Sequence, residues 1–308
     1  MENIREVLKE LMSKRQLDTK FQDLMTPVYE DADVLKFCEE HKNELSTDGV
    51  ARSASKLYEY VQERDKYNRN EPTLMPGYQP ILIVNNHMIE VSYQPSKKLL
   101  ANEKQRAFNM RVKAVNMPKM IRRARFDDFF PDQDRQTALT AALNFIQAYE
   151  KDPHQFHKGL YLTGSFGVGK TYLLGAIANE LATQGYESTL VHFPSFAVEM
   201  KNAIGENNLA EKLNLVKKAP ILMLDDVGAD AMSSWVRDEV LGVILEYRMQ
   251  NELPTFFSSN FSLPQLETEH LQINQRGESE PLKAKRLMER IKFLATEVTM
   301  VGVNRRQK

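Results

Sequence analysis

Eight consecutive residues, 164–171, carry the clearest chemical signal in the chain. They read Gly-Ser-Phe-Gly-Val-Gly-Lys-Thr, so three glycines precede a lysine and a hydroxyl. The glycines let backbone N–H groups turn toward an anion, the lysine can reach the β- and γ-phosphates, and the threonine hydroxyl is placed to hold Mg²⁺. The motif predicts a nucleotide site formed by Gly164, Ser165, Phe166, Gly167, Val168, Gly169, Lys170 and Thr171.

The segments on both sides of this loop match the context that the motif requires. Residues 159–163 form a short apolar run suited to a buried strand, and apolar residues recur at helical spacing after the loop. A helix that begins at the loop directs the positive end of its dipole at the phosphates. The alternative, an ordinary glycine turn, requires neither of these neighbours.

Two carboxylates end a second apolar run, residues 220–226. In a parallel sheet such a run is buried on both faces, and its carboxyl end opens where ligands bind. Asp225 is then a candidate ligand of Mg²⁺, and Asp226 is a candidate general base that orients and polarises a water. Taken alone, the same residues are equally typical of a strand that ends in an acidic turn.

A third strand candidate, residues 254–260, ends in an amide instead of an acid. If this strand lies between the first two, Asn260 reaches the γ-phosphate side of the site and can hold the attacking water. The alternative is a turn-forming asparagine, which is common after a strand.

Arginines near the carboxyl end of the chain are candidates for stabilising the charge that develops in phosphoryl transfer. Arg286 and Arg290 are four residues apart on a predicted helix and so share one face. We expect Arg290 to act on the nucleotide of a neighbouring subunit. From these residues alone the favoured interpretation is an ion pair with acids such as Glu289 or Glu297, and the role of Arg290 rests on the family pattern. Further along, the adjacent residues Arg305 and Arg306 follow a predicted strand and can swing onto the nucleotide.

Strands and helices alternate from residue 126 to the end of the chain, which predicts an α/β domain with a parallel sheet flanked by helices. The expected strands are 159–163, 188–193, 220–226, 254–260 and 296–301, and the expected helices include 136–149, 233–249 and 283–293.

The N-terminal part has a different pattern. Residues 1–62 show short helical repeats of apolar residues, and residues 81–93 predict a β-hairpin with an asparagine-rich turn. Ten basic residues and one acid lie between Lys97 and Arg125. This stretch is either a solvated linker helix or a contact for nucleic-acid phosphates. The predicted domains are therefore 1–96, a basic linker at 97–125, and 126–308.

Composition limits the class of protein. The single cysteine, Cys38, indicates a reducing compartment, and the formal net charge of −1 names no partner. The charged, amphipathic N-terminus does not resemble a signal peptide, and no apolar run approaches the roughly 20 residues of a membrane span. We expect a soluble cytoplasmic protein without membrane contact. A nuclease is disfavoured, because no cluster of acids or histidines with metal spacing lies outside the nucleotide site.

In their order, these motifs resemble the AAA+ replication-initiation ATPases, specifically the bacterial helicase loaders. The resemblance covers nearly the whole chain and is most specific at residues 159–180, 223–260 and 284–290. It implies a protein that binds ATP and Mg²⁺, grips the hexameric replicative helicase through the N-terminal domain 1–96, and places it on single-stranded DNA. Other primosome proteins and self-assembly of the AAA+ domain are implied as well. The resemblance assigns Lys170 and Thr171 to Walker A and Asp225 and Asp226 to Walker B. It also implies that Asn260 is sensor 1, that Arg290 is the arginine finger, and that Arg306 or Arg305 is a sensor 2-like arginine.

Two departures from the family pattern matter. Some loaders carry a zinc site in the N-terminal domain, but residues 67–93 contain no cysteine and one histidine, His87, so we predict no zinc. Many AAA+ proteins have glutamate at the position of Asp226, whose side chain is one methylene shorter. We therefore expect slow, partner-stimulated ATP hydrolysis. Two alternatives remain open: a transposition-type AAA+ regulator, and a helicase-binding adaptor whose nucleotide is only structural.

Overall fold

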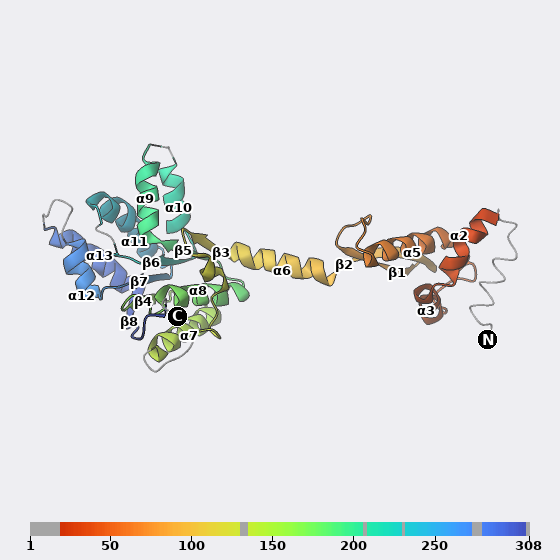
Figure 1. Ribbon diagram of the computed structural model, residues 1–308, viewed down its shortest axis with the longest axis horizontal. Coiled ribbons are helices and arrows are strands. Elements are labelled where there is room, and N and C mark those ends of the chain that lie inside the picture. The colour runs from red at the N-terminus through yellow and green to blue at the C-terminus, as the bar shows by residue number, and fades with distance from the viewer. Residues whose placement is uncertain (1–18, 130–134, 206–207, 230–231, 273–278, 306–308) are drawn as a thin grey trace. The chain divides into compact units, whose positions relative to one another are not determined.

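The computed structural model describes residues 19–129, 135–205, 208–229, 232–272 and 279–305 (Figure 1). Its contacts divide the chain into two compact units, Met1–Gln105 and Arg106–Lys308, and each unit is described by itself. The first 18 residues of the predicted helical region lie outside the described part. Within the described residues, no helix is long and apolar enough to cross a membrane.

The first unit combines short helices with one hairpin, as predicted. The helices are α2 (Thr19–Tyr29), α3 (Ala32–Glu40), α4 (Gly49–Arg52) and α5 (Ala54–Asn68). Strands β1 (Tyr78–Asn85) and β2 (Met88–Pro95) pair antiparallel, and both turn residues, Asn86 and His87, have positive φ angles. The core of this unit is formed by the buried residues Met25, Val28, Tyr29, Val34, Cys38, Ala54, Leu57, Tyr60, Val61 and Ile89.

An ionic cluster ties two helices of the first unit together. The guanidinium of Arg64 on α5 donates to both carboxylate oxygens of Asp31, at 2.6 and 2.7 Å, and to Asp33 at 2.8 Å. Asp31 also caps α3, because its carboxylate accepts the backbone N–H groups of Asp33 and Val34. One aspartate therefore holds the start of α3 against α5.

The second unit is built on a six-stranded sheet in which every neighbouring pair is parallel. The strands are β3 (Val112–Val115), β4 (Gly159–Thr163), β5 (Ser188–His192), β6 (Ile221–Asp225), β7 (Thr255–Ser259) and β8 (Ala295–Thr299). Their order across the sheet is β3-β5-β6-β7-β4-β8. Strand β7 thus lies between β6 and β4, which is the arrangement that the prediction for Asn260 required.

Helices cover both faces of this sheet (Figure 1). They are α7 (Gln136–Lys151), α8 (Lys170–Thr183), α9 (Phe193–Ala203), α10 (Leu209–Lys217), η2 (Val236–Leu241), α11 (Gly242–Gln250), α12 (Leu263–Gln265), η3 (Leu266–Leu271) and α13 (Pro281–Leu294). Alternate residues of β6 point to opposite faces: Ile221 and Met223 pack with α7 and α8, whereas Leu222 and Leu224 pack with the helices that follow β5. This two-sided burial explains why the strand sequences are continuously apolar.

The basic stretch is divided between a helix and the second unit. Helix α6 (Lys97–Arg111) contains no buried residue, but the next residues form β3, which pairs with β5. The short 3₁₀ helix η1 (Lys119–Arg123) follows, and Asn179 of α8 donates to its Ile121 carbonyl at 2.9 Å. The contacts thus separate the two units after residue 105, while the predicted linker extends to residue 125. Strand β3 and helices α10, α12 and η3 were not predicted.

Candidate nucleotide site

A pocket of about 790 Å³ lies where the carboxyl ends of the parallel strands meet. Parallel pairing brings the ends of β4, β5, β6 and β7 to one edge of the sheet, although their residues are far apart in the sequence. The pocket is lined by Pro118, Met120, Ile121, Asp128, Arg135, Phe166, Gly167, Gly169, Lys170, Thr171, Tyr172, His192, Asp225, Asp226, Ser258, Asn260 and Arg305. It therefore unites the predicted phosphate loop with both aspartates and the asparagine.

The phosphate loop connects β4 to α8 in a conformation that only glycine tolerates well. Gly164, Gly167 and Gly169 have positive φ angles of 149°, 77° and 102°. A Cβ on Gly164 would lie 2.0 Å from the Met300 carbonyl oxygen, and one on Gly167 would lie 1.9 Å from Asn304 Oδ1. Helix α8 begins directly after Gly169, so its first backbone N–H groups open toward the loop. This cradle fits the phosphates of a nucleotide.

A chain of hydrogen bonds joins the loop lysine to the second aspartate. The Lys170 ammonium donates to the Gly164 and Ser165 carbonyls at 2.6 and 2.9 Å and to Asn260 Oδ1 at 2.8 Å. The other end of the same amide, Asn260 Nδ2, donates to Asp226 Oδ1 at 3.1 Å. Asn260 thus links the cation that would bind phosphate to the carboxylate that would orient the water.

The first aspartate is buried and held by two hydroxyls. Thr171 Oγ1 donates to Asp225 Oδ1 at 2.8 Å, and Ser258 Oγ donates to the same oxygen at 2.5 Å. Burial raises the pKa of the Asp225 carboxyl, against these hydrogen bonds, which lower it. A hydroxyl and a carboxylate in direct contact at the start of α8 are suitable oxygen ligands for Mg²⁺, and a bound cation would favour the ionised carboxylate.

Asp226 adopts an uncommon backbone conformation. Its φ angle of 62° is in the left-handed region, which is sparsely populated for residues other than glycine and costs about 1–3 kcal/mol. The backbone N–H of Asp226 donates to Ser258 Oγ at 3.0 Å, and Asn260 holds its side chain. This conformation turns the carboxylate into the pocket, beside the end of β7.

Several polar residues of the pocket were not singled out from the sequence, among them Ser258, His192 and Arg135. Ser258 bridges Asp225 and the backbone of Asp226, and His192 at the end of β5 places Nε2 3.9 Å from Asp226 Oδ2. His192 follows an apolar run, so its place at a strand end was an available signal. Arg135 offered no such signal, because only the packing of α7 beside the loop brings it into the pocket.

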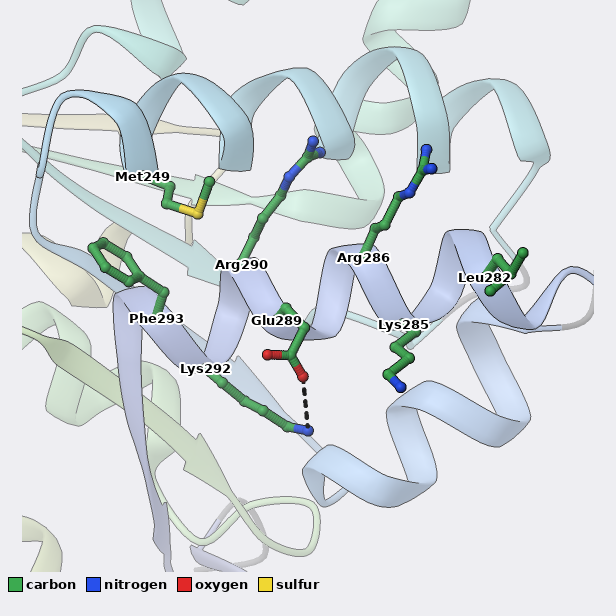
Figure 2. A pocket seen from close by; sticks show the side chains of 8 residues that line it. All are labelled: Met249, Leu282, Lys285, Arg286, Glu289, Arg290, Lys292 and Phe293. Carbon is green, nitrogen blue, oxygen red and sulfur yellow. Dashed lines mark ion pairs between the residues drawn. The ribbon is translucent and has the colours of Figure 1, made fainter.

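The candidate arginines lie in different places. Arg305 lines the nucleotide pocket, and its backbone N–H donates to the Gly167 carbonyl at 3.1 Å. Arg306 lies outside the described residues. Arg290 lines a different pocket, of about 700 Å³, along α13, where it points toward α11 together with Arg286 (Figure 2). Its guanidinium donates to the Gly242 carbonyl at 3.0 Å and lies 3.2 Å from Glu246.

The ion pair of Arg290 is therefore formed with Glu246 of α11, and not with Glu289 or Glu297. Glu289 instead lies 3.8 Å from Lys292, and Glu297 accepts the backbone N–H of Leu263 at 3.0 Å. Within one chain, Arg290 does not join the residues of the nucleotide pocket.

Known proteins resemble both units. A family model of the primosomal protein DnaI N-terminus matches residues 1–93, and one of the bacterial DnaA ATPase domain matches residues 120–276. The replicative helicase loader DnaI of Bacillus subtilis (strain 168) is 40% identical over 314 aligned residues, which cover 99% of this chain and 99% of that protein. The chain belongs to the DnaI family of replicative helicase loaders.

Solved structures of DnaI-like proteins match the chain as well. A crystal structure of DnaI is 46% identical, has a TM-score of 0.56, and covers 62% of this chain and 98% of that one. A candidate primosome component from Streptococcus pyogenes serotype M3 is 44% identical, with a TM-score of 0.55 and coverage of 66% and 99%. The predicted family and fold class are confirmed: an AAA+ ATPase domain follows a DnaI-type N-terminal domain with a hairpin.

The DnaI-type assignment also bears on the alternatives. Similarity over 99% of both chains includes the N-terminal unit, which is the part expected to select the partner, so a transposition-type regulator is not better supported than a helicase loader. In the described residues, no group of three or more His, Cys, Asp or Glu side chains is placed to hold a metal ion. The absence of a zinc site in the whole N-terminal domain stays a prediction.

Proposed function

We propose that the chain is an ATP-dependent loader that binds the hexameric replicative helicase and delivers it onto single-stranded DNA when replication initiates or restarts. The observation that carries the proposal is the union, in one chain, of a DnaI-type N-terminus and a pocket that joins a phosphate loop to Asp225, Asp226 and Asn260. We assign helicase binding to the N-terminal domain 1–96 and nucleotide binding to the second unit.

Nucleotide binding in this proposal depends on three groups of the pocket. The N–H groups of the loop and the Lys170 ammonium bind the phosphates, with Lys170 exchanging carbonyl partners for phosphate oxygens. Thr171 and Asp225 would hold Mg²⁺, which would supply positive charge to the phosphate chain. The terminal arginines, Arg305 or Arg306, add a contact from the carboxyl end of the chain.

Hydrolysis requires a positioned water and a base. In this proposal Asp226 accepts the proton of the water, and Asn260 orients both Asp226 and the water, because its amide already bonds Asp226 and Lys170. The short aspartate side chain reaches less far than glutamate, so the rate without partners is slow. A slow ATPase suits a switch, in which the γ-phosphate holds one assembly and hydrolysis releases it.

Arg290 completes the site from a neighbouring subunit. Arg290 lies away from the nucleotide pocket of its own chain. It stands on α13 in a groove that is also lined by the cationic side chains of Lys285, Arg286 and Lys292 (Figure 2). Such a place is expected for an arginine that acts on the nucleotide of another subunit. Assembly of AAA+ domains, or of AAA+ domain and partner, would then stimulate hydrolysis. The proposed setting is the bacterial cytoplasm, with other primosome proteins as further partners.

One experiment tests partner and nucleotide dependence together. Purified chain is mixed with the replicative helicase, with and without ATP and single-stranded DNA, and the mass of each complex is measured. We expect a stable complex with the helicase and a transfer of helicase to DNA that requires ATP. Absence of any complex between the chain and the helicase would contradict the proposal.

The variant Lys170→Ala separates a loader from an adaptor whose nucleotide is structural. It removes the cation of the phosphate loop but leaves the first unit unchanged. We expect the variant to bind helicase and to fail in transferring it to DNA. Transfer at the wild-type level would instead support the adaptor.

A further inference from the structure

The nucleotide pocket contains a buried cation that no step above uses. Arg135 lies at the start of α7, where only 3% of its surface is exposed, and it lines the pocket together with Gly169 and Lys170. The described residues beside it include Phe129, from the segment before α7, and Gly169 of the phosphate loop.

The position of Arg135 is set by an aromatic ring. Its guanidinium carbon lies 3.7 Å from the centre of the Phe129 ring, which is itself buried and lies 6.3 Å from the Tyr172 ring in a stacked orientation. Arginine packs well on an aromatic face through the plane of its guanidinium, and its N–H groups then point away from the ring. The ring therefore determines where the charge is held.

Arg135 also lies against the phosphate loop itself. A Cβ on Gly169 would approach Arg135 Nη2 to 2.6 Å, so the glycine that immediately precedes Lys170 leaves space for the guanidinium. The φ angle of Gly169 is 102°, which independently favours glycine at this position. The cation and the start of α8 thus approach the same part of the pocket.

We propose that Arg135 is a second phosphate-binding cation of the nucleotide site. It approaches the phosphate chain from the α7 side of the loop, whereas Lys170 approaches from the side of Asn260. The inference rests on the proposed nucleotide binding and adds a residue to it. Because guanidinium–phosphate contacts are charge-assisted and bidentate geometry suits them, Arg135 contributes to affinity for nucleotides with a phosphate chain.

The competing explanation is a contact with the base or ribose, because Ile121 and Tyr172 also line the pocket. A ligand series separates the two. If Arg135 contacts the phosphates, its replacement weakens binding of ATP and ADP but leaves binding of adenosine unchanged. If Arg135 contacts the base or has a purely structural role, its replacement weakens binding of all three ligands equally.

The test uses the full chain with Arg135→Met and, as a matched control, Arg69→Met, which changes an exposed arginine of the first unit. Because removal of one member of a buried charged contact destabilises a protein, we expect the melting temperature without nucleotide to fall, and binding is measured at a temperature at which the variant is folded. The variant Arg135→Gln removes the same charge but keeps a polar end, and it gives the same comparison if the methionine variant does not fold.

Calorimetry should show at least about a 10-fold loss of affinity for ATP and ADP in the Arg135 variants, less than about 3-fold for adenosine, and no loss in the control. An ATP affinity within about 2-fold of the wild type, or an equal loss of affinity for adenosine, would overturn this inference but would leave the proposed nucleotide binding intact. If the unchanged chain binds no ATP, nucleotide binding itself fails, and the inference fails with it.

Discussion

In the first unit the Arg64 guanidinium is surrounded by carboxylates, whereas in the second unit the Lys170 ammonium is surrounded by carbonyl and amide oxygens. Arg64 contacts Asp31, Asp33 and Asp65 within 3.1 Å. Lys170 donates within 2.9 Å to two loop carbonyls and to Asn260. A charge neutralised inside the protein stabilises the fold, while a charge held by neutral oxygens keeps its attraction for an anionic ligand.

Arg248 shows that neutral partners alone do not create a binding site. This residue is fully buried, and its guanidinium donates to the hydroxyl of Thr255 and to the carbonyls of residues 217, 219, 220 and 254, at the starts of β6 and β7. Burial lowers the pKa of Arg248 to about 9. It lines neither the nucleotide pocket nor the pocket along α13, and its hydrogen bonds serve the fold. A ligand site needs both a neutral shell and open space.

The largest effect is expected for Arg248→Ala. The variant leaves several buried carbonyls without donors and opens a cavity, so we expect a loss of about 3–5 kcal/mol in unfolding free energy. Denaturation of the second unit, followed by the fluorescence of Trp235, measures it. A loss below about 1 kcal/mol would show that water replaces the guanidinium.

Lys170→Met should separate affinity from stability. The variant removes the ammonium but keeps the length of the side chain, so we expect about a 100-fold loss in ATP affinity with little change in melting temperature. Nucleotide titration and thermal unfolding of the same preparation check both parts. A large drop in melting temperature without ATP would mean that Lys170 serves the fold in the way that Arg64 does.

Arg64→Met should have the opposite result. It leaves Asp31 and Asp33 without their cation, and the side chain of Arg64 is only 15% exposed, so we expect the first unit to lose about 2 kcal/mol of stability. ATP affinity should remain unchanged. Hydrogen exchange of residues 19–68, compared with the control Arg69→Met, localises the effect.

The smallest effect is a difference in pH dependence between Asp31 and Asp225. Burial opposes ionisation of Asp31, but the hydrogen bonds from Arg64 and from the start of α3 outweigh it and lower its pKa. Its contribution to stability is therefore present above the ordinary aspartate pKa of about 4 and is lost as the pH falls through the lowered value in the folded protein.

For Asp225 the sign is reversed. Burial raises its pKa, so the folded protein takes up the proton before the unfolded chain does, and stability rises as the pH falls through the raised value. We expect Asp225→Asn to stabilise the chain at pH 7 and to lose this advantage toward about pH 4, whereas the cost of Asp31→Asn should stay constant down to about pH 4 and decrease only below it. Unfolding of both variants at several pH values measures this. Equal slopes of unfolding free energy against pH for the two variants would contradict the comparison.

Local patterns predicted much of the second unit. The strands 159–163 and 220–226 and the helix after the phosphate loop were expected from apolar spacing, and they form β4, β6 and α8. Strand β3 was missed because Lys113 and neighbouring cations give its segment the composition of a linker, and an edge strand needs less apolar sequence than a central one. Helix α10 was also missed, although Leu209, Leu213 and Val216 recur in it at helical spacing.

The site was predictable to the extent that its residues stand at the ends of apolar runs. Asp225 and Asn260 do so, Lys170 and Thr171 belong to the phosphate-loop motif, and all four meet in one pocket. Arg135 follows no strand and belongs to no motif. Its place depends on the Phe129 ring and on the packing of α7 against α8 and the sheet, which is a long-range contact.

The sequence by itself determined the chemistry of the phosphate loop, because glycine, lysine and threonine at successive positions need only local backbone geometry to face an anion. It also determined which segments end in acids or amides. Only the tertiary structure decided that β7 inserts between β6 and β4, which joins Asn260 to both Lys170 and Asp226. It likewise decided that Arg290 faces α11, since strand order and helix packing depend on burial of surfaces that are distant along the chain.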